Sequence, residues 1–344
     1  MKNLLSILSA VGALIAPDLA RAQDTVTVFG VVDVGLARLT GSSASVNGVS
    51  TGGANISRLG FRGTEDMGGG LKAGFWLEAG MDVDAGAGKA TGSALNFNRR
   101  STVSVMGAFG EVRLGRDDAA TFLSTLIFDP FLTNGVGGTM AFVMRTGAPL
   151  IQISNAVSYF LPASLGGFYG QVQHAFGEQL SGTANSSQGN YNGLRFGYRA
   201  GPLNAAFATG KLKGSTSAAD ISLNNLGLSY DLGVVRPILL WATEKQGATK
   251  VSALQLGVVA PIGTGQLRAQ YSRFNTNNSA VDWTKLAIGY GYDLSKRTAL
   301  YGTVARVSNS SGAAKSIGVQ GLAAPGTALG SSSSGYEVGI RHTF

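Results

Sequence analysis

Apolar and polar residues alternate with a period of two in many short segments of this chain. Around residue 288, Leu286, Ile288 and Tyr290 share one parity, whereas Lys285 and Asp293 share the other. Alternation of this kind predicts β-strands with one apolar and one polar face. Several apolar sets end in Tyr or Phe while the opposite face carries charges, which favours a sheet with lipid outside and water inside.

Short segments rich in Gly, Pro, Asp and Asn separate the alternating segments, and each predicts a tight turn. They lie at 64–70, 107–110, 162–167, 199–203, 230–235, 260–266 and 293–297. These seven hairpins give fourteen strands, and a first strand from Thr25 and a last strand ending at Phe344 make sixteen. The other connections are longer and polar, and lie at 41–53, 84–95, 117–151, 177–190, 213–220, 245–250, 275–281 and 308–334.

Short connections at one end and long connections at the other are typical of outer-membrane barrels. A barrel of about sixteen strands encloses an aqueous channel rather than a packed interior. We therefore predict an all-β fold, a transmembrane antiparallel β-barrel of 16 strands over residues 23–344. The alternative is a secreted β-sandwich, which would place charges on a buried face at a high cost unless each were paired.

The last strand, GYEVGIRHTF, fits this prediction. Val338, Ile340 and Phe344 fall on the apolar parity, whereas Glu337 and Arg341 fall on the polar one. A strand can end abruptly on an aromatic residue where neighbours pair with it on both sides, because a closed barrel has no edge.

The N-terminal segment predicts export. A lysine at position 2 precedes an apolar run over residues 4–16, and ARA at 20–22 fits a small-x-small cleavage site. We predict a signal peptide over residues 1–22 and a mature chain from Gln23. The run is shorter than the roughly 20 residues of a membrane-spanning helix.

Composition narrows the chemistry. Charged residues make up 13% and apolar residues 44% of the chain, and the 51 glycines have no collagen-like period. Cysteine is absent, which excludes disulfides and thiolate chemistry. Without the signal peptide, 25 basic residues (27 − 2) stand against 18 acidic ones (19 − 1), a net charge of +7. A basic balance suits nucleic acid, an anionic membrane surface or an anionic solute. No basic run with interleaved aromatic residues is present, which disfavours nucleic acid.

Long stretches of the chain resemble the general diffusion porins of Gram-negative β-proteobacteria, from the mature start to the last residue. They are FGVVDVGLARL (29–39), SRLGFRGTEDMGGGLKAGFWLE (57–78), FNRRSTVSVMGAFGEVRLGRD (97–117), DLSKRTALYG (293–302) and VGIRHTF (338–344). The resemblance implies a homotrimer in the cell outer membrane, in contact with lipid and lipopolysaccharide. It also implies that the third long loop folds into the lumen as a constriction. The last strand with Phe344 would be the signal for the outer-membrane assembly machinery.

The segment 117–151 fits that constriction loop independently. Connections of this length are uncommon and usually functional. The segment contains the charged residues Asp117, Asp129 and Arg145. Its apolar residues predict that it packs against another part of the chain, and they are Phe122, Leu123, Leu126, Ile127, Phe128, Phe131 and Leu132.

Porins similar to this one narrow the pore with arginines from the barrel wall near that loop. The matching residues are Arg58 in SRLG and Arg99 and Arg100 in RRSTVS. Parity directs Arg100 inward, whereas Arg99 requires a strand end or a bulge to reach the lumen. A third family arginine aligns with Gln152, so we expect a milder anion preference than in porins that keep it; Arg145 is the nearby residue that could compensate.

The polar parity predicts which other charges line the lumen. The basic residues are Arg58, Arg62, Lys72, Arg100, Arg113, Arg195, Arg199, Arg268, Lys285 and Arg341, and the acidic ones include Asp33, Glu78, Glu111, Asp231, Asp293 and Glu337. The basic excess makes the interior positive, and arginines in a pore select for anions.

We conclude from the sequence that the chain is a passive diffusion channel for small hydrophilic solutes and ions, with a preference for anions. The predicted constriction comprises Arg58, Arg62, Arg99, Arg100, Asp117, Asp129 and Arg145. Two alternatives are a substrate-specific porin for an anionic solute and a surface adhesin or receptor barrel. An enzyme is disfavoured because His174 and His342 both fall on the lipid parity. No catalytic residue, metal site or cofactor is predicted.

Overall fold

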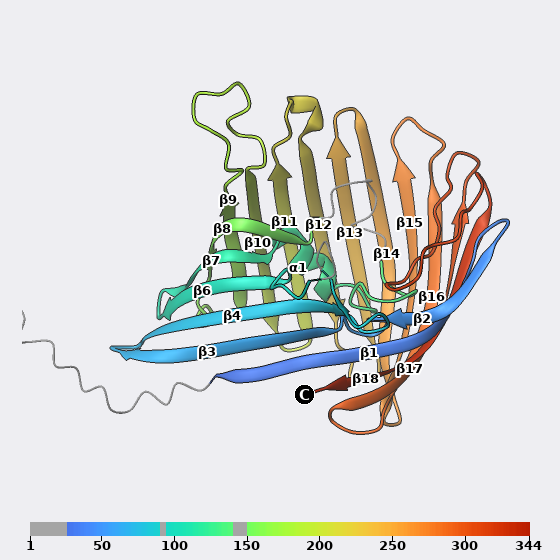
Figure 1. The fold of residues 1–344 in the computed structure, drawn as a ribbon, viewed down its shortest axis with the longest axis horizontal. Helices are drawn as coiled ribbons and strands as arrows, with labels where there is room; N and C mark the ends of the chain where they lie inside the picture. The colour runs from blue at the N-terminus through green and yellow to red at the C-terminus, as the bar shows by residue number, and fades with distance from the viewer. Residues whose placement is uncertain (1–25, 90–93, 140–149) are drawn as a thin grey trace, which may run out of the picture.

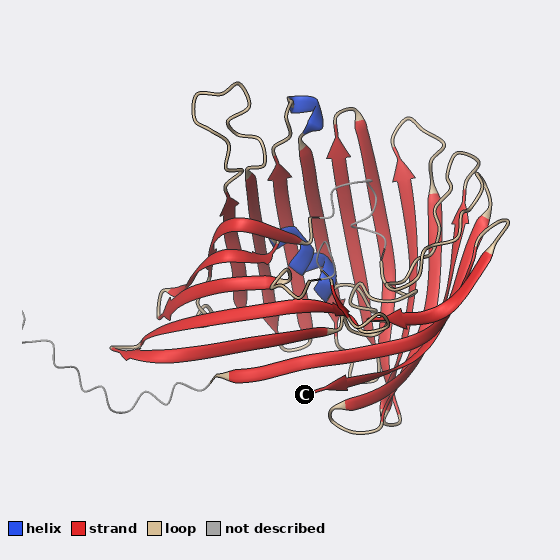
Figure 2. Cartoon of the chain, viewed as in Figure 1, coloured by secondary structure: helices blue, strands red, loops and turns tan. Residues whose placement is uncertain are grey.

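The structure is a computed structural model that describes residues 26–89, 94–139 and 150–344. Figure 1 and Figure 2 show a ring of long antiparallel strands with short helical segments. The strands are β1 (Thr27–Thr40), β2 (Ser45–Thr51), β3 (Arg58–Gly68), β4 (Leu71–Asp82), β5 (Ala87–Gly88), β6 (Arg100–Gly107), β7 (Gly110–Asp118), β8 (Gln152–Phe160), β9 (Phe168–Ala175), β10 (Tyr191–Ala200), β11 (Leu203–Leu212), β12 (Ile221–Tyr230), β13 (Arg236–Gln246), β14 (Thr249–Ile262), β15 (Gly265–Thr276), β16 (Trp283–Asp293), β17 (Thr298–Asn309) and β18 (Ser332–Thr343). The helical segments are α1 (Ala120–Ile127) and the 3-10 helix η2 (Ser217–Ala219).

The ring has sixteen strand positions, which confirms the predicted barrel. β2 and β3 together form one position, because both pair with β1, whereas β5 pairs only with the end of β4. The 18 labelled strands therefore make 16 positions (18 − 2). The ring closes where β1 pairs antiparallel with β18, from Val31 opposite Thr343 to Thr40 opposite Ser334.

The two faces of the barrel differ as the alternation predicts. On β16, Leu286 and Ile288 are 59% and 47% exposed on the outer face, whereas Lys285 on the inner face is 4% exposed. Exposed apolar side chains suit lipid, and the polar inner face suits water. Aromatic residues mark the outer face near the short turns, among them Phe168, Tyr230 and Tyr292.

All seven predicted short turns connect consecutive barrel strands. Several of the predicted long connections are wrong in part, and residues 84–95 include β5, which pairs with the end of β4. Residues 41–53 include β2, which pairs with β1, and residues 245–250 form most of a hairpin in which Lys245 lies opposite Lys250. Strands that extend beyond the lipid can be polar on both faces, so polar composition alone did not separate strand from loop.

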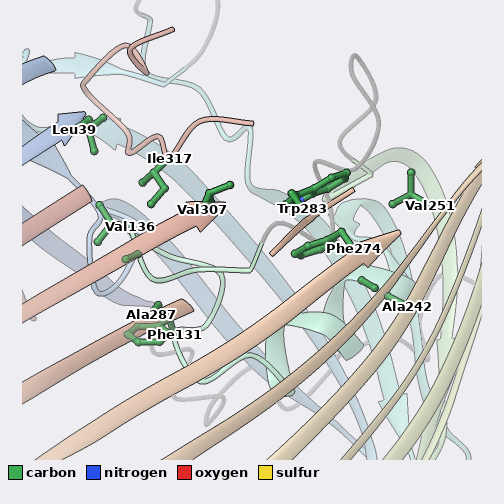
Figure 3. Packing of buried hydrophobic residues seen from close by; sticks show 12 residues of the cluster. Leu39, Phe131, Val136, Ala242, Val251, Phe274, Trp283, Ala287, Val307 and Ile317 are labelled. Carbon is green, nitrogen blue, oxygen red and sulfur yellow. The ribbon is translucent and has the colours of Figure 1, made fainter. Parts of the chain in front are cut away.

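The connection between β7 and β8 lies against the inner wall of the barrel. Its helix α1 contacts β9, β10, β11 and β12, and Figure 1 shows it within the ring of strands. Downstream of α1, Phe131 and Val136 join an apolar cluster with the stacked rings of Phe274 and Trp283 (Figure 3). Within the described residues, no helix is long and apolar enough to cross a bilayer.

Candidate pore constriction

Two of the predicted arginines share one carboxylate on the inner wall. Arg58 opens β3, and its Nη1 lies 3.1 Å from Oε1 of Glu78 on β4. Arg99 directly precedes β6, and its Nε lies 2.5 Å from the same oxygen. Arg99 thus reaches the inner face from a strand end, where parity no longer dictates the direction of the side chain. Glu78 is 7% exposed, so this arrangement places two positive charges and one negative charge at one point of the wall.

A second group of charges lies on β6 and β7. Arg100 faces inward, and its Nε lies 3.6 Å from Oδ1 of Asp117. Arg113 contacts the other oxygen of Asp117, and its Nε lies 2.8 Å from Glu111. Asp117 therefore lies within β7, between two arginines, rather than in the loop.

Trp76 connects the two groups. Its ring lies 4.5 Å from the guanidinium carbon of Arg100 and 5.0 Å from that of Arg62. Phe29 packs edge-on against the same indole and also contacts Arg62. Guanidinium groups bind aromatic faces favourably, so these contacts hold Arg62 and Arg100 against the wall. The indole Nε1 of Trp76 donates a 3.2 Å hydrogen bond to Oε2 of Glu78, which links the aromatic ring to the first group of charges.

We name the inner surface of β3, β4, β6 and β7 with these charges the arginine wall. Four arginines (58, 99, 100 and 113) face three carboxylates (78, 111 and 117), a net charge of +1 (4 − 3). Arg62 and Asp118 at its edges add one charge of each sign and leave this sum unchanged.

Gln152 lies beside this wall at the position of the expected third arginine. Its amide Nε2 donates a 2.9 Å hydrogen bond to Oδ1 of Asp118. An amide satisfies that carboxylate without adding a charge, so the local positive charge is lower by one than it would be with the arginine expected at this position. Arg145, the residue expected to compensate, lies outside the described residues.

The segment that faces the arginine wall is residues 119–139, which we name the inserted loop. Polar side chains of the opposite inner wall donate hydrogen bonds to its backbone carbonyls: Asn225 to Thr121, Gln255 to Phe128, Gln270 to Gly137 and Lys285 to Gly138. Phe122, Phe128 and Phe131 are buried, as the apolar content of the loop predicted, whereas Ile127 and Leu132, which the same prediction included, are each 40% exposed. Lys285, expected to line the lumen, is instead covered by this loop.

Asp129 has a different place from the one we predicted. Its carboxylate accepts hydrogen bonds from the backbone N–H groups of Phe131, Thr133 and Thr139, at 2.8, 3.1 and 2.6 Å. The residue is 1% exposed, so it shapes the inserted loop and does not face the arginines across open lumen. Burial raises the pKa of Asp129 to about 6, against the three backbone donors and the charge of Lys285, which lower it.

Two acidic residues expected to line the lumen are also buried anchors. Asp33 accepts hydrogen bonds from the backbone N–H groups of residues 53–55, at 3.2, 2.9 and 2.7 Å, and from the Tyr301 hydroxyl at 2.7 Å. Glu337 accepts hydrogen bonds from the Ser50 hydroxyl at 2.7 Å and from the Val136 N–H at 3.1 Å. The second of these connects β18 to the inserted loop. The inward parity located both residues, but it could not distinguish an anchor from a residue that lines the pore.

Phe344 lies at the seam where the barrel closes. Its backbone N–H donates to the carbonyl of Gly30 at 3.1 Å, and its carbonyl accepts the Gly30 N–H at 3.0 Å. A Cβ at position 30 would lie 2.3 Å from the Phe344 ring, so the ring requires a glycine beneath it. The terminal residue thus completes the pairing of β18 with β1.

The two histidines do not take part in the inner wall. His174 and His342 face outward, where they bond to Asn192 and Thr298. Among the residues that the structure describes, no group of three His, Cys, Asp or Glu side chains could hold a metal ion.

Comparison with known proteins agrees with this architecture. The family model described as Gram-negative porin matches residues 8–312. This chain belongs to that family. The porin is 40% identical to Outer membrane porin protein 32 of Delftia acidovorans, over 98% of this chain and 99% of the relative. The family places it in the outer membrane of Gram-negative bacteria as a multi-pass β-barrel, and family and fold are those of channel proteins.

Two solved structures resemble this porin along most of its length. The anion-selective porin from Comamonas acidovorans superposes with a TM-score of 0.85 at 37% identity, covering 94% of this chain and 100% of that one. OmpT of Vibrio cholerae, in its trimer form, has a TM-score of 0.67 at 15% identity, covering 93% and 99%. The second comparison shows a shared fold.

Proposed function

We propose that this porin is a passive diffusion channel for small hydrophilic solutes and ions that prefers anions. The observation that carries the proposal is the arginine wall, in which four inward arginines, with Arg62 at the edge, gather on adjacent strands opposite the inserted loop. The likeness to a porin named as anion-selective, at 37% identity over nearly the whole chain, supports it.

The narrow section lies between the arginine wall and the inserted loop in this proposal. Arg58, Arg99 and Arg100 supply the charges that anions meet, and Arg62 extends the path toward the short-turn end. Asp117 holds Arg100 in place. Asp129 acts indirectly, because it keeps the loop in shape. A low-dielectric wall focuses the potential of such a cluster into the pore.

The test is the reversal potential of the channel in a planar bilayer under a KCl gradient. Chloride permeability above potassium permeability supports the proposal, and the preference should weaken at high salt because the Debye length is only about 10 Å at 0.1 M. A cation-selective channel would contradict it. Currents that saturate with one anionic solute would favour the substrate-specific alternative.

The porin is proposed to be exported, assembled and used as a homotrimer. The mature chain would begin at Gln23, which N-terminal sequencing of the purified protein tests. Electrophoresis without heating should show a trimer, as the Vibrio cholerae structure in trimer form suggests for the fold.

Phe344 is the proposed signal for the assembly machinery, and its place at the seam gives a second reason for a terminal aromatic. Deleting Phe344 should lower the amount of folded trimer in the outer membrane. Refolding of the purified variant in detergent separates the two roles, since a signal acts only in the cell whereas the seam acts in both settings.

The outer surface near the long connections suits lipopolysaccharide. Lys245, Lys250, Arg273 and Arg306 are exposed on the outward parity of β13, β14, β15 and β17, above the apolar band. Among the described residues, none of the four forms an ion pair. Basic groups at a membrane surface attract anionic headgroups, so this belt is proposed to contact lipid phosphates. Replacing all four with Gln should reduce the lipopolysaccharide that copurifies with the trimer.

A further inference from the structure

A separate cavity of about 260 Å³ lies on the inner wall formed by β15 to β18. Arg268 on β15 and Arg341 on β18 line it, together with Gln266, Asp293 and Thr303. The inserted loop borders it through Phe131, and the turn after β2 borders it through residues 53–54. None of these residues belongs to the arginine wall, so the cavity is a distinct part of the lumen.

Gly291 on β16 borders the hollow, whereas a Cβ at Gly289 would lie 2.6 Å from the Thr303 hydroxyl and 2.9 Å from the Phe131 ring. Gly289 and Gly291 both face inward, on the parity of Lys285. A Cβ at position 291 would have only one neighbour within 4 Å, at 3.9 Å, so this part of the strand borders open space. The pairing of Arg268 with Gly289 and of Gln266 with Gly291 places the longer side chains beside these glycines.

The two arginines that line the cavity are poorly neutralised. Nη2 of Arg341 lies 3.9 Å from Oδ1 of Asp293, whose side chain is 54% exposed, and exposed pairs of this kind contribute little. The Nε of Arg341 is buried and has no hydrogen-bond partner. Arg268 donates only a 3.4 Å hydrogen bond to Gln266 and has no ion pair among the described residues. Both arginines line the same cavity, so an anion bound there would reduce the repulsion between their like charges.

We propose that this cavity is a second anion site, which binds the oxyanion group of a small solute, a carboxylate or a phosphate, between Arg268 and Arg341. Guanidinium groups present planar sets of donors that match the two oxygens of a carboxylate or phosphate in a bidentate contact, whereas chloride is a single acceptor atom and cannot form that paired contact. The Thr303 hydroxyl is available as a further donor. Asp293 competes with the ligand for Arg341. The inference rests on the proposed anion channel and adds a site that distinguishes oxyanions from chloride.

The experiment measures how inorganic phosphate or succinate reduces the chloride current of single trimers in a planar bilayer. Arg268→Gln and Arg341→Gln should each raise the half-blocking concentration about tenfold, equivalent to about 1.4 kcal/mol. Asp293→Asn should lower it, because the competing carboxylate is removed. Arg199→Gln, which removes an inward charge outside the cavity, is the matched control and should leave it unchanged.

Each outcome has a distinct meaning. Unchanged block in Arg268→Gln and Arg341→Gln, with the wild type still anion-selective, overturns the second site and leaves the proposed function intact. An equal shift in Arg199→Gln also overturns it, since a general loss of positive charge would then explain the result. A wild type without anion preference contradicts the proposed function instead. Block by phosphate without block by succinate, or the reverse, identifies which oxyanion fits. Trimer on unheated gels and unchanged single-channel conductance in 1 M KCl verify that the variants fold.

Discussion

The two walls of the lumen use the same residue type in different ways. On the arginine wall, four arginines contact three carboxylates, and Trp76 holds two guanidinium groups in place. On the wall formed by β15 to β18, Arg268 and Arg341 have one distant carboxylate between them and lie beside a hollow lined by glycines. Inward arginines therefore do not have equal effects on an ion. Partners decide whether an arginine is an ordered part of the wall or a charge that is free to bind a solute.

The largest effect on selectivity is expected when charges are removed from the arginine wall. Replacing Arg58, Arg99 and Arg100 with Ser changes its net charge from +1 to −2, because the carboxylates remain. Charges about 4 Å apart interact by about 1 kcal/mol in water and several times that at an effective dielectric near 20. We therefore expect most of the anion preference to disappear, measured as the reversal potential under a KCl gradient.

The structure adds a necessary control to this prediction. Without the arginines, Glu78 is left nearly buried without a cation, which destabilises a protein, whereas Asp117 keeps its ion pair with Arg113. Adding Glu78→Gln to the triple variant should restore folding while keeping the anion preference below that of the wild type. A triple variant that folds and keeps the wild-type reversal potential would exclude these arginines as the filter.

A smaller effect, an increase in anion preference, is expected when a carboxylate is removed from the arginine wall. Glu78→Gln removes the carboxylate shared by Arg58 and Arg99 and raises the net charge of the wall from +1 to +2. The amide oxygen can still accept a hydrogen bond, so the arginines stay near their places. We expect a stronger anion preference, by a factor of about 2 to 5, which corresponds to about 0.4–1 kcal/mol. Asp82→Asn is the matched control, because that carboxylate pairs with Lys89 instead, and an equal effect there would refute the assignment.

A substitution of Trp76 tests whether the fixed positions of the arginines, rather than the net charge of the wall, affect the current. Trp76→Leu removes the aromatic face from Arg62 and Arg100, and each such contact stabilises by about 0.5–2 kcal/mol. The net charge stays the same, so we expect the reversal potential to change little while noise in the single-channel current increases. A shift in reversal potential as large as that of Glu78→Gln would mean that arginine position, and not charge alone, sets the selectivity.

The smallest effect on the currents is expected from Asp129, which lies in neither wall. Its pKa is raised to about 6 by burial, from an ordinary value of 3.8. Between about pH 4 and pH 6 the folded state binds more protons than the unfolded state, so the free energy of unfolding falls as pH rises. Above pH 6 this contribution is constant. The change totals about 2–3 kcal/mol over that window.

Urea unfolding of the refolded barrel between pH 4 and pH 7 measures this change. Asp129→Asn should lose that part of the pH dependence, whatever its absolute stability. Equal slopes in wild type and variant would show that the Asp129 carboxyl has the same pKa in both states.

The sequence by itself determined the barrel. Period-two alternation, as at Leu286 and Ile288 against Lys285, is a local property, and the lipid and the water on the two sides of the wall act on each strand separately. The seven short turns follow from local turn chemistry in the same way. The sequence did not predict the strand ends that extend beyond the lipid. Water lies on both faces of the sheet there, so β2 and the hairpin at Lys245 have the polar composition of a loop.

Only the tertiary structure decided what the inward residues do. The sequence placed Asp33, Glu78, Asp129, Lys285 and Glu337 inside the barrel or on its loop. In the structure Glu78 forms ion pairs with two arginines, whereas the other four form hydrogen bonds with backbone groups. These roles depend on which residues meet across neighbouring strands and on where the inserted loop meets the opposite wall. The contacts of the loop join residues more than a hundred positions apart in the chain, as in the contact of Glu337 with Val136. Alternation specifies the side of the sheet to which a residue points, and the closure of the barrel specifies what it meets there.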